Sequence, residues 1–123
     1  VEEAVALYRA ALQRFESTLV SHPNNYDALL SCALINFRLM DLNVLEFHSE
    51  FMRLKRTTEG YFHRVLVLCS EEDIEPVLQC ARFYVSCNEM DMAEQYYLLA
   101  IEQQPQSHQA LLAYAEFLLS MGQ

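Results

Sequence analysis

Glycine and proline are scarce in this chain of 123 residues, which contains two glycines and three prolines. An all-β fold needs a turn about every 8–12 residues, usually with one of these residues, and this sequence cannot supply so many. Alternating strand and helix units would also need more chain breaks. Hydrophobic residues make up 53% of the sequence, too many for a disordered segment. The composition therefore predicts an all-α protein whose helices are joined by few turns.

Other absences argue against membrane and nucleic-acid partners. No apolar run approaches the roughly 18 residues of a membrane span, and the N-terminal sequence lacks the pattern of a secretory signal. The net charge is −9, which argues against nucleic acid because its phosphates require clustered Lys and Arg. A basic or mixed-charge protein surface is the better expectation for a partner.

The four cysteines lack the spacing of disulfide or metal sites. None belongs to a Cys-x-x-Cys motif, and none has a histidine at ligand spacing. Cys80 and Cys87 lie on one helix face but about 10 Å apart along the axis, too far for a bridge. We expect small buried thiols, no metal, no cofactor, and an intracellular, reducing compartment such as the cytoplasm.

Catalytic motifs are also missing. The sequence has no Ser or Cys nucleophile with an obvious partner, no His-Glu-x-x-His motif and no glycine-rich phosphate loop. The acidic segment 70–73 suits a helix N-terminus that is capped by Ser70 or Asp73. We therefore expect neither enzymatic activity nor a small-molecule substrate.

The C-terminal third of the sequence has the apolar spacing of two helices. One stripe, with residues at i, i+3, i+4, i+7 and i+8, consists of Ala93, Tyr96, Tyr97, Ala100 and Ile101. Pro105 ends that helix, and Ser107 is a suitable N-cap for the next. The second stripe consists of Ala110, Leu111, Tyr114, Ala115 and Leu118. Gly122 follows as a C-terminal stop, so the pattern predicts two antiparallel helices.

The same pattern recurs upstream with a period of 34 residues. When Ile74 is aligned with His108, the apolar positions of the two helices coincide, and Asn88 coincides with Gly122. A third copy of the first-helix pattern opens at Tyr26. Its Leu29, Cys32, Ala33 and Asn36 fall on the positions of Val77, Cys80, Ala81 and Tyr84. Such a period indicates a repeated helix–turn–helix unit.

On these residues the chain resembles the tetratricopeptide repeat family. The positions that match the family pattern are Val77, Ala81, Tyr84, Asn88, Ala93, Tyr97, Ala100 and Pro105. Only the glycine of the mid-repeat turn is missing, and Asn88 tolerates the same left-handed backbone. The resemblance implies a right-handed α-α superhelix of antiparallel helix pairs, with about six helices, that holds protein or peptide partners.

The resemblance treats 1–123 as one helical-repeat domain. Residues 1–23 are then the second helix of a partial repeat, 73–106 a regular repeat, and 107–123 the first helix of a further repeat. Residues 24–70 form a repeat with about 13–14 extra residues, because the repeat positions are 48 residues apart here instead of 34. Helical spacing continues across the insertion, so we expect one extended helix near 43–69.

The first helix of each pair lines the concave face of such a superhelix. Its exposed side predicts a partner-binding groove made of Leu30, Leu34, Arg38, Leu78, Arg82, Leu112 and Glu116. An apolar stripe edged by charge suits an amphipathic helix or an extended peptide. Alternatively, a neighbouring helix already covers the leucines.

A second candidate site is a basic patch on the extended helix. It consists of Arg53, Lys55, Arg56 and Arg64, four of the eight basic residues. The patch is either a solvated helix face or a docking site for an acidic partner or another copy of the chain. We expect a protein-interaction scaffold or peptide-binding module within a larger intracellular assembly. The alternatives are an RNA-binding helical repeat and a helical regulatory domain of an enzyme complex.

The two ends of the sequence suggest head-to-tail association. Val1 reads like the residue after a mid-repeat turn, and Gly122 like the turn itself. We expect one copy's C-terminal helix to pack on another's N-terminal helix, or flanking parts of a longer chain to cover both. A third option is that the extended first helix folds over its own exposed face.

Overall fold

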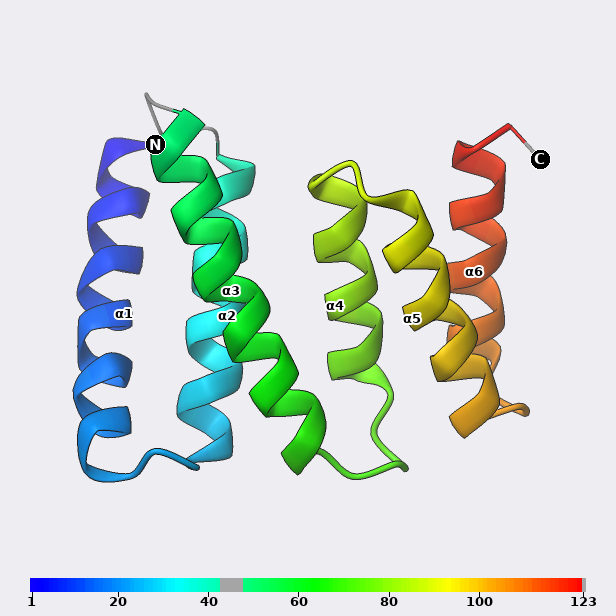
Figure 1. The fold of residues 1–123 in the computed structure, drawn as a ribbon, viewed down its shortest axis with the longest axis horizontal. Coiled ribbons are helices and arrows are strands. Elements are labelled where there is room, and N and C mark those ends of the chain that lie inside the picture. The colour runs from blue at the N-terminus through cyan, green and yellow to red at the C-terminus, as the bar shows by residue number, and fades with distance from the viewer. Residues whose placement is uncertain (43–47, 123) are drawn as a thin grey trace. The chain divides into compact units, whose positions relative to one another are not determined.

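The computed structural model describes residues 1–42 and 48–122, and these residues form α-helices and no strand. The chain divides into two compact parts, Val1–Leu68 and Cys69–Gln123, which we call unit 1 and unit 2. The helices of unit 1 are α1 (Glu2–Ser21), α2 (Tyr26–Asp41) and α3 (His48–Leu68) (Figure 1). The helices of unit 2 are α4 (Glu75–Ser86), α5 (Met90–Gln103) and α6 (His108–Ser120). The prediction of an all-α protein is confirmed.

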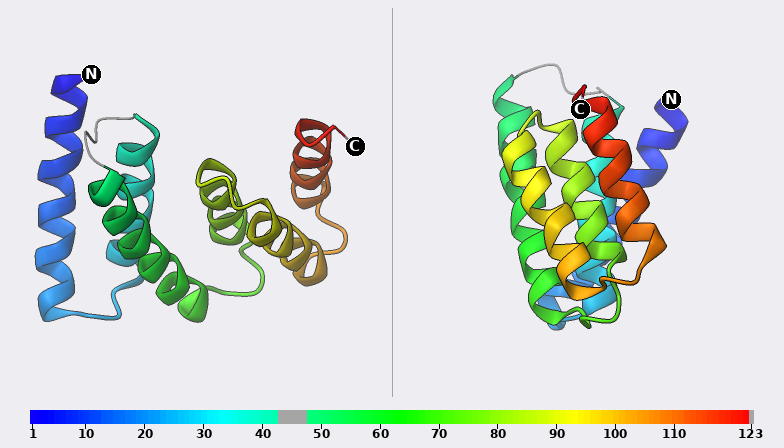
Figure 2. Two further views of the ribbon diagram at one scale, coloured as in Figure 1. Left: turned by 45° about the horizontal axis from the view of Figure 1, so that its top comes forward. Right: turned by 90° about the vertical axis from the view of Figure 1, so that its right-hand side faces the viewer.

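In unit 1, α2 packs against both α1 and α3 (Figure 2). The centre of this unit is formed by side chains without solvent exposure, namely Leu29, Cys32, Ala33, Thr58, Phe62 and Val65. By contrast, Val5 is the buried residue of α1. The outer helix is therefore held along one narrow face, as its amphipathic sequence requires.

The extended helix is present over the residues that the structure describes. Helix α3 runs from His48 to Leu68 and continues through Gly60 without a break. The hydroxyl of Thr58 is buried and donates to the carbonyl oxygen of Leu54 at 2.7 Å, and it also lies 3.8 Å from the Met40 sulfur of α2. The expected start near residue 43 lies outside the described residues.

In unit 2, α5 packs against both α4 and α6. The apolar stripes and the repeat pattern predict buried positions for Ala81, Ala93, Ala100 and Ala115, and the first three are completely buried. The prediction for Ala115 is wrong, because this alanine is exposed. The buried face of α6 is formed by Ala110, Ala113 and Phe117 instead. The ring of Phe117 lies 5.0 Å from that of Tyr97, centroid to centroid, and this contact turns the Ala115 side away from α5.

The helix ends follow from local side chains. Asn25 and Ser107 act as N-caps, accepting from the backbone N–H groups three residues later at 2.9 and 3.2 Å. The N-cap of α4 is Ile74 and not Ser70 or Asp73 as predicted, although the carboxylate of Asp73 accepts from the N–H of Glu75. Asn88 has a φ of 60° and Gly122 a φ of 81°, so both adopt the left-handed backbone expected of equivalent turn positions.

Candidate functional site

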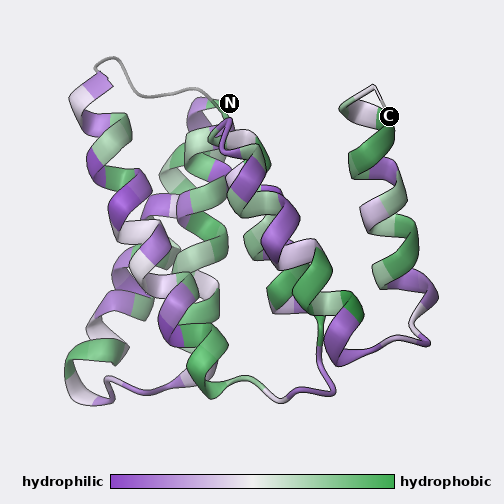
Figure 3. Cartoon of the chain, turned by 45° about the vertical axis from the view of Figure 1, so that its right-hand side comes forward, coloured by the Kyte–Doolittle hydropathy of each residue, from purple (hydrophilic) through white to green (hydrophobic). Residues whose placement is uncertain are grey.

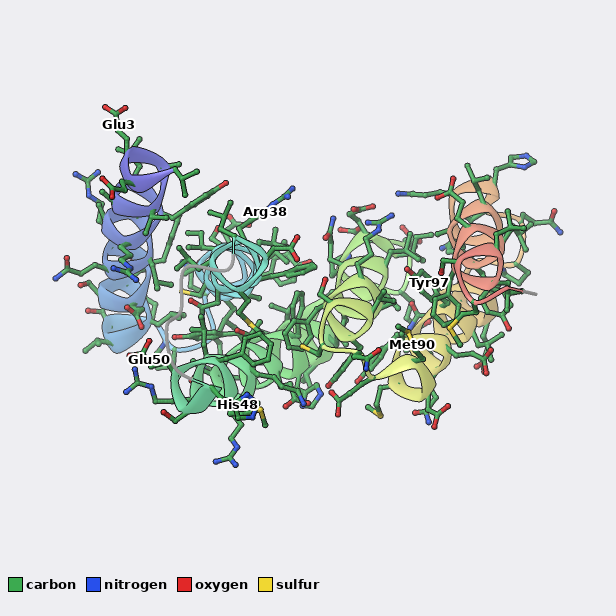
Figure 4. All side chains as sticks on the ribbon, turned by 90° about the horizontal axis from the view of Figure 1, so that it is seen from above. Glu3, Arg38, His48, Glu50, Met90 and Tyr97 are labelled. Carbon is green, nitrogen blue, oxygen red and sulfur yellow. The ribbon has the colours of Figure 1, made fainter. Side chains whose placement is uncertain are left out.

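The structure places the predicted groove residues differently in the two units. In unit 1, Leu30 and Leu34 are half-buried, whereas Arg38 is exposed and points away from α2 (Figure 4). In unit 2, Leu78 is completely buried, and its expected exposure is wrong. The reason is that seven of the twelve residues of α4 are buried, which leaves this helix only a narrow exposed face.

The exposed face of α4 begins with a polar cluster around Glu75. Its carboxylate accepts from the side-chain amide of Gln79 at 2.8 Å and pairs with the guanidinium of Arg82 at 3.4 Å. It also accepts from the amide of Gln109, in the first turn of α6. The last contact places the first turns of α4 and α6 side by side within unit 2.

Tyr97 of α5 lies where the next turns of α4 and α6 face one another. Its side chain is buried, and burial is the main cause that raises the pKa of its hydroxyl. The positive charge of Arg82 opposes this rise in pKa, and the negative charge of Glu116 adds to it. Arg82 and Glu116 therefore have opposite effects on the pKa of the same phenol.

Leucine side chains continue this surface along α6. Leu112 is 61% exposed and Leu119 is 73% exposed. With Glu116 they occupy positions i, i+4 and i+7, one face of a helix. Figure 3 shows hydrophobic residues along α6. We call the combined set the α4–α6 surface, and it comprises Glu75, Arg82, Gln109, Leu112, Glu116 and Leu119.

The α4–α6 surface lies in a strongly acidic part of the chain. Residues 69–123 contain nine acidic residues and one basic residue, Arg82, a net charge of −8. Residues 1–68 contain eight acidic and seven basic residues, a net charge of −1. The field around the α4–α6 surface therefore attracts cationic groups.

Sequence reasoning did not predict that the charges of Arg82 and Glu116 act on the hydroxyl of Tyr97. The spacing identified this residue only as part of a packing stripe, and its ring does pack against Tyr114 and Phe117. The available signal was its hydroxyl, because a buried phenol needs a polar neighbour where a phenylalanine would not.

The predicted basic patch is divided in the structure. Arg53 and Arg56 are exposed, whereas Lys55 is half-buried. Arg64 is exposed as well, but its guanidinium donates to the carbonyl oxygen of Pro23, in the loop between α1 and α2. Arg53 and Arg64 are eleven residues apart, about 16 Å along the helix. The four cations therefore do not form one compact cluster.

Other kinds of site find no support in the part of the chain that the structure describes. Over 1–42 and 48–122, no three His, Cys, Asp or Glu side chains come together where they could hold a metal ion. Cys32 and Cys80 are buried and Cys69 and Cys87 are partly exposed, and these four described cysteines form no disulfide. Within the same ranges, no helix has the length and apolar character needed to cross a membrane.

Comparison with protein families and with curated proteins gives no relative from which a site could be transferred. The sequence matches no family model and no curated protein. Interpretation of the α4–α6 surface therefore depends on its own residues.

Proposed function

We propose that this protein is a helical-repeat scaffold of the tetratricopeptide type that binds a peptide segment of a partner protein and has no catalytic activity of its own. The observation that carries this proposal is the α4–α6 surface, where exposed leucines adjoin a set of charged and amide side chains. Such a scaffold would act within a larger intracellular assembly.

One contact and one shared backbone conformation in unit 2 support the repeat. Glu75 and Gln109 are 34 residues apart, one repeat length, and their side chains form a hydrogen bond. Asn88 and Gly122 are also 34 residues apart and share the left-handed backbone. Equivalent residues in successive repeats are expected to be neighbours in a right-handed superhelix of helix pairs.

The composition of the surface selects the kind of peptide. Leu112 and Leu119 offer apolar area that a hydrophobic side chain can cover, which is the usual source of affinity in peptide recognition. Glu75 and Glu116 favour cationic groups, and the charge of −8 on unit 2 adds to that preference. The expected ligand is an amphipathic segment with apolar and basic residues.

Selection from a displayed peptide library tests the proposal. The unmodified chain serves as bait, and the variant Leu112→Asp serves for counter-selection. We expect enriched peptides that combine apolar and basic residues and that bind Leu112→Asp at least about tenfold more weakly, because the substitution places a charge in the apolar contact.

Leu7 provides the matched control for this experiment. It is 68% exposed, close to the exposure of Leu112, but it lies on α1 in unit 1. Leu7→Asp should leave the affinity of the selected peptides unchanged. Failure to enrich any peptide, or equal loss of binding in both variants, would contradict a peptide-binding role of the α4–α6 surface.

A further inference from the structure

A cavity of about 420 Å³ lies within unit 1. All three helices of the unit contribute to its wall, which is formed by Arg9, Leu12, Asn36, Leu39, Glu50, Arg53, Leu54 and Thr57. None of these residues belongs to the α4–α6 surface. The cavity is therefore a second, separate candidate site.

Asn36 is the most informative residue of the wall. It is only 2% exposed, and its Oδ1 is buried without a hydrogen-bond partner in the part of the chain that the structure describes. A buried acceptor without a partner costs about 1–3 kcal/mol. A ligand that donates an O–H or N–H to this amide would recover that cost, so the cavity favours a ligand with a donor at its buried end.

The rest of the wall defines the body of such a ligand. Leu12, Leu39 and Leu54 supply apolar contacts from three different helices. A side chain with an apolar ring and a single polar tip fits this combination, and tyrosine and tryptophan are of that kind.

Charged residues of the cavity wall determine which peptide residues can flank the bound aromatic side chain. Arg9 of α1 and Arg53 of α3 are both exposed, and both line the cavity. Glu50, in the first turn of α3, is the acidic residue of the wall (Figure 4). Unit 1 also holds seven of the eight basic residues of the chain. Carboxylates beside the ring would meet the two arginines, which form strong charge-assisted hydrogen bonds with carboxylates.

Unit 2 shows what an aromatic ring does at the equivalent position. In the repeat alignment, Asn36 corresponds to Tyr84. The ring of Tyr84 is 1% exposed and stacks on Tyr96, with 5.5 Å between the ring centroids. Unit 1 therefore has a cavity and a small amide where unit 2 is filled by a ring of its own.

We propose that the unit 1 cavity binds a tyrosine or tryptophan side chain from an acidic peptide segment of a partner protein. The hydroxyl or indole N–H donates to Oδ1 of Asn36, and the flanking carboxylates of the peptide pair with Arg9 and Arg53. This inference rests on the proposed function in one respect, since it takes the ligand to be a peptide.

Titration with a synthetic peptide tests the inference. The probe is acetyl-Glu-Glu-Tyr-Glu-Glu-amide, and the two control peptides replace its Tyr by Ala or its four Glu by Lys. We expect the full 123-residue chain to bind the probe by isothermal titration calorimetry, and to bind each control at least tenfold more weakly. Equal affinity for the probe and the alanine peptide would overturn the proposal.

Variants of the chain locate the binding. Asn36→Tyr should fill the cavity with the residue found in unit 2 and reduce affinity at least tenfold. Arg53→Glu should do the same, whereas Arg56→Glu makes the same charge change on α3 outside the cavity wall and should have little effect. If Asn36→Tyr does not fold, the comparison of Arg53→Glu with Arg56→Glu still tests the proposal. Equal affinities of these two variants for the probe would overturn it.

Two further readouts separate binding in the cavity from binding at the α4–α6 surface and from self-association. Leu112→Asp should leave binding of the probe unchanged, because Leu112 does not line the cavity. Failure of the α4–α6 proposal and failure of the cavity proposal therefore give different results. Light scattering of the chain alone shows whether copies associate. Self-association that competes with the probe and is abolished by Asn36→Tyr would overturn the proposal in favour of a second copy as the occupant.

Discussion

Units 1 and 2 use the same helical pattern but differ at one central position. Cys32 and Ala33 of α2 correspond to Cys80 and Ala81 of α4, and all four are completely buried. Asn36 and Tyr84 follow three residues later, and there the two units diverge. The positions nearest to the helix contacts are the same in both units, whereas the next position is filled by an aromatic ring in one and leaves a cavity in the other. The two units therefore share a way of packing, and they differ in what occupies the position of Asn36 and Tyr84.

The two units also differ in net charge. Unit 2 carries a net charge of −8, and unit 1 a net charge of −1 with most of the basic residues. The negative charge of unit 2 therefore favours basic segments at the α4–α6 surface. An acidic segment in unit 1 would depend on short-range contacts with Arg9 and Arg53 instead. The two proposed sites share no residue and would select peptides of opposite charge.

Removing the ring from unit 2 should have the largest effect on stability. Tyr84→Asn makes unit 2 resemble unit 1 at this position, and it removes the contacts of Tyr84 with Tyr96 and Phe83. We expect the free energy of unfolding, measured by urea denaturation, to fall by about 3–5 kcal/mol. A loss below about 1 kcal/mol would mean that the ring does not fill the core of unit 2 in the way described.

Overpacking the shared alanines should have a smaller effect, and the effect should be similar in both units. Ala33→Leu and Ala81→Leu each insert bulk at a completely buried position. We expect each to lower the free energy of unfolding by about 1–3 kcal/mol. If one variant melts within a degree of the unmodified chain while the other is strongly destabilised, the two positions are not equivalent and the repeat alignment fails.

High pH should weaken unit 1 through the pair formed by Cys32 and Tyr61. Burial, aided by the Glu16 carboxylate, raises the pKa of the Cys32 thiol from 9.0 to about 11, although its hydrogen bond with Tyr61 opposes the rise. Burial likewise raises the pKa of the Tyr61 hydroxyl from 10.0 to about 12. The unfolded chain loses these protons at lower pH than the folded chain does. The stabilisation is therefore complete below pH 9 and is lost as the pH rises through 11 and then 12.

Urea denaturation at pH 8 and pH 11 measures this loss. For Cys32 alone we expect a decrease of about 1–2 kcal/mol in the free energy of unfolding. Cys32→Ala should show a smaller decrease between the same two pH values. If the free energy of unfolding falls equally between the two pH values in the unmodified chain and in Cys32→Ala, the Cys32 thiol is accessible to solvent in the folded protein.

Filling the unit 1 cavity should give the smallest change, and its sign should be opposite to the others. Asn36→Leu removes the buried amide whose Oδ1 has no partner among the residues that the structure describes, and it adds apolar contacts in the cavity. We expect the free energy of unfolding to rise by about 1 kcal/mol. Asn24→Leu, at an exposed position, is the control and should change little. A destabilised Asn36→Leu variant would indicate that the amide is satisfied in the folded protein.

Much of the fold was predictable because it depends on local spacing. The apolar stripes predicted the all-helical class, Ser107 predicted a helix start, and the alignment of Asn88 with Gly122 predicted two left-handed turns. The exposure of Ala115 and the burial of Leu78 were not predictable in this way. The exposure of both residues depends on the rotation of each helix about its own axis. An apolar stripe is too wide to determine that rotation.

The candidate sites were less predictable than the fold. Arg82, Leu112 and Glu116 were identified as surface residues, but the hydrogen bonds of Glu75 with Gln79 and Gln109 depend on how α4 and α6 pack. The unit 1 cavity was missed entirely. Its signal in the sequence was Asn36, an amide at the position where the aligned helix has a tyrosine, and a single polar residue in an apolar stripe does not reveal whether a cavity adjoins it.

Peptide binding at the α4–α6 surface is the central claim, and NMR chemical-shift mapping tests it most directly. The ¹⁵N-labelled chain is titrated with a peptide selected on the unmodified protein. The largest shifts should occur at Arg82, Gln109, Leu112 and Glu116, and Leu112→Asp should abolish them. An absence of shifts, or shifts confined to residues outside α4 and α6, would contradict the claim.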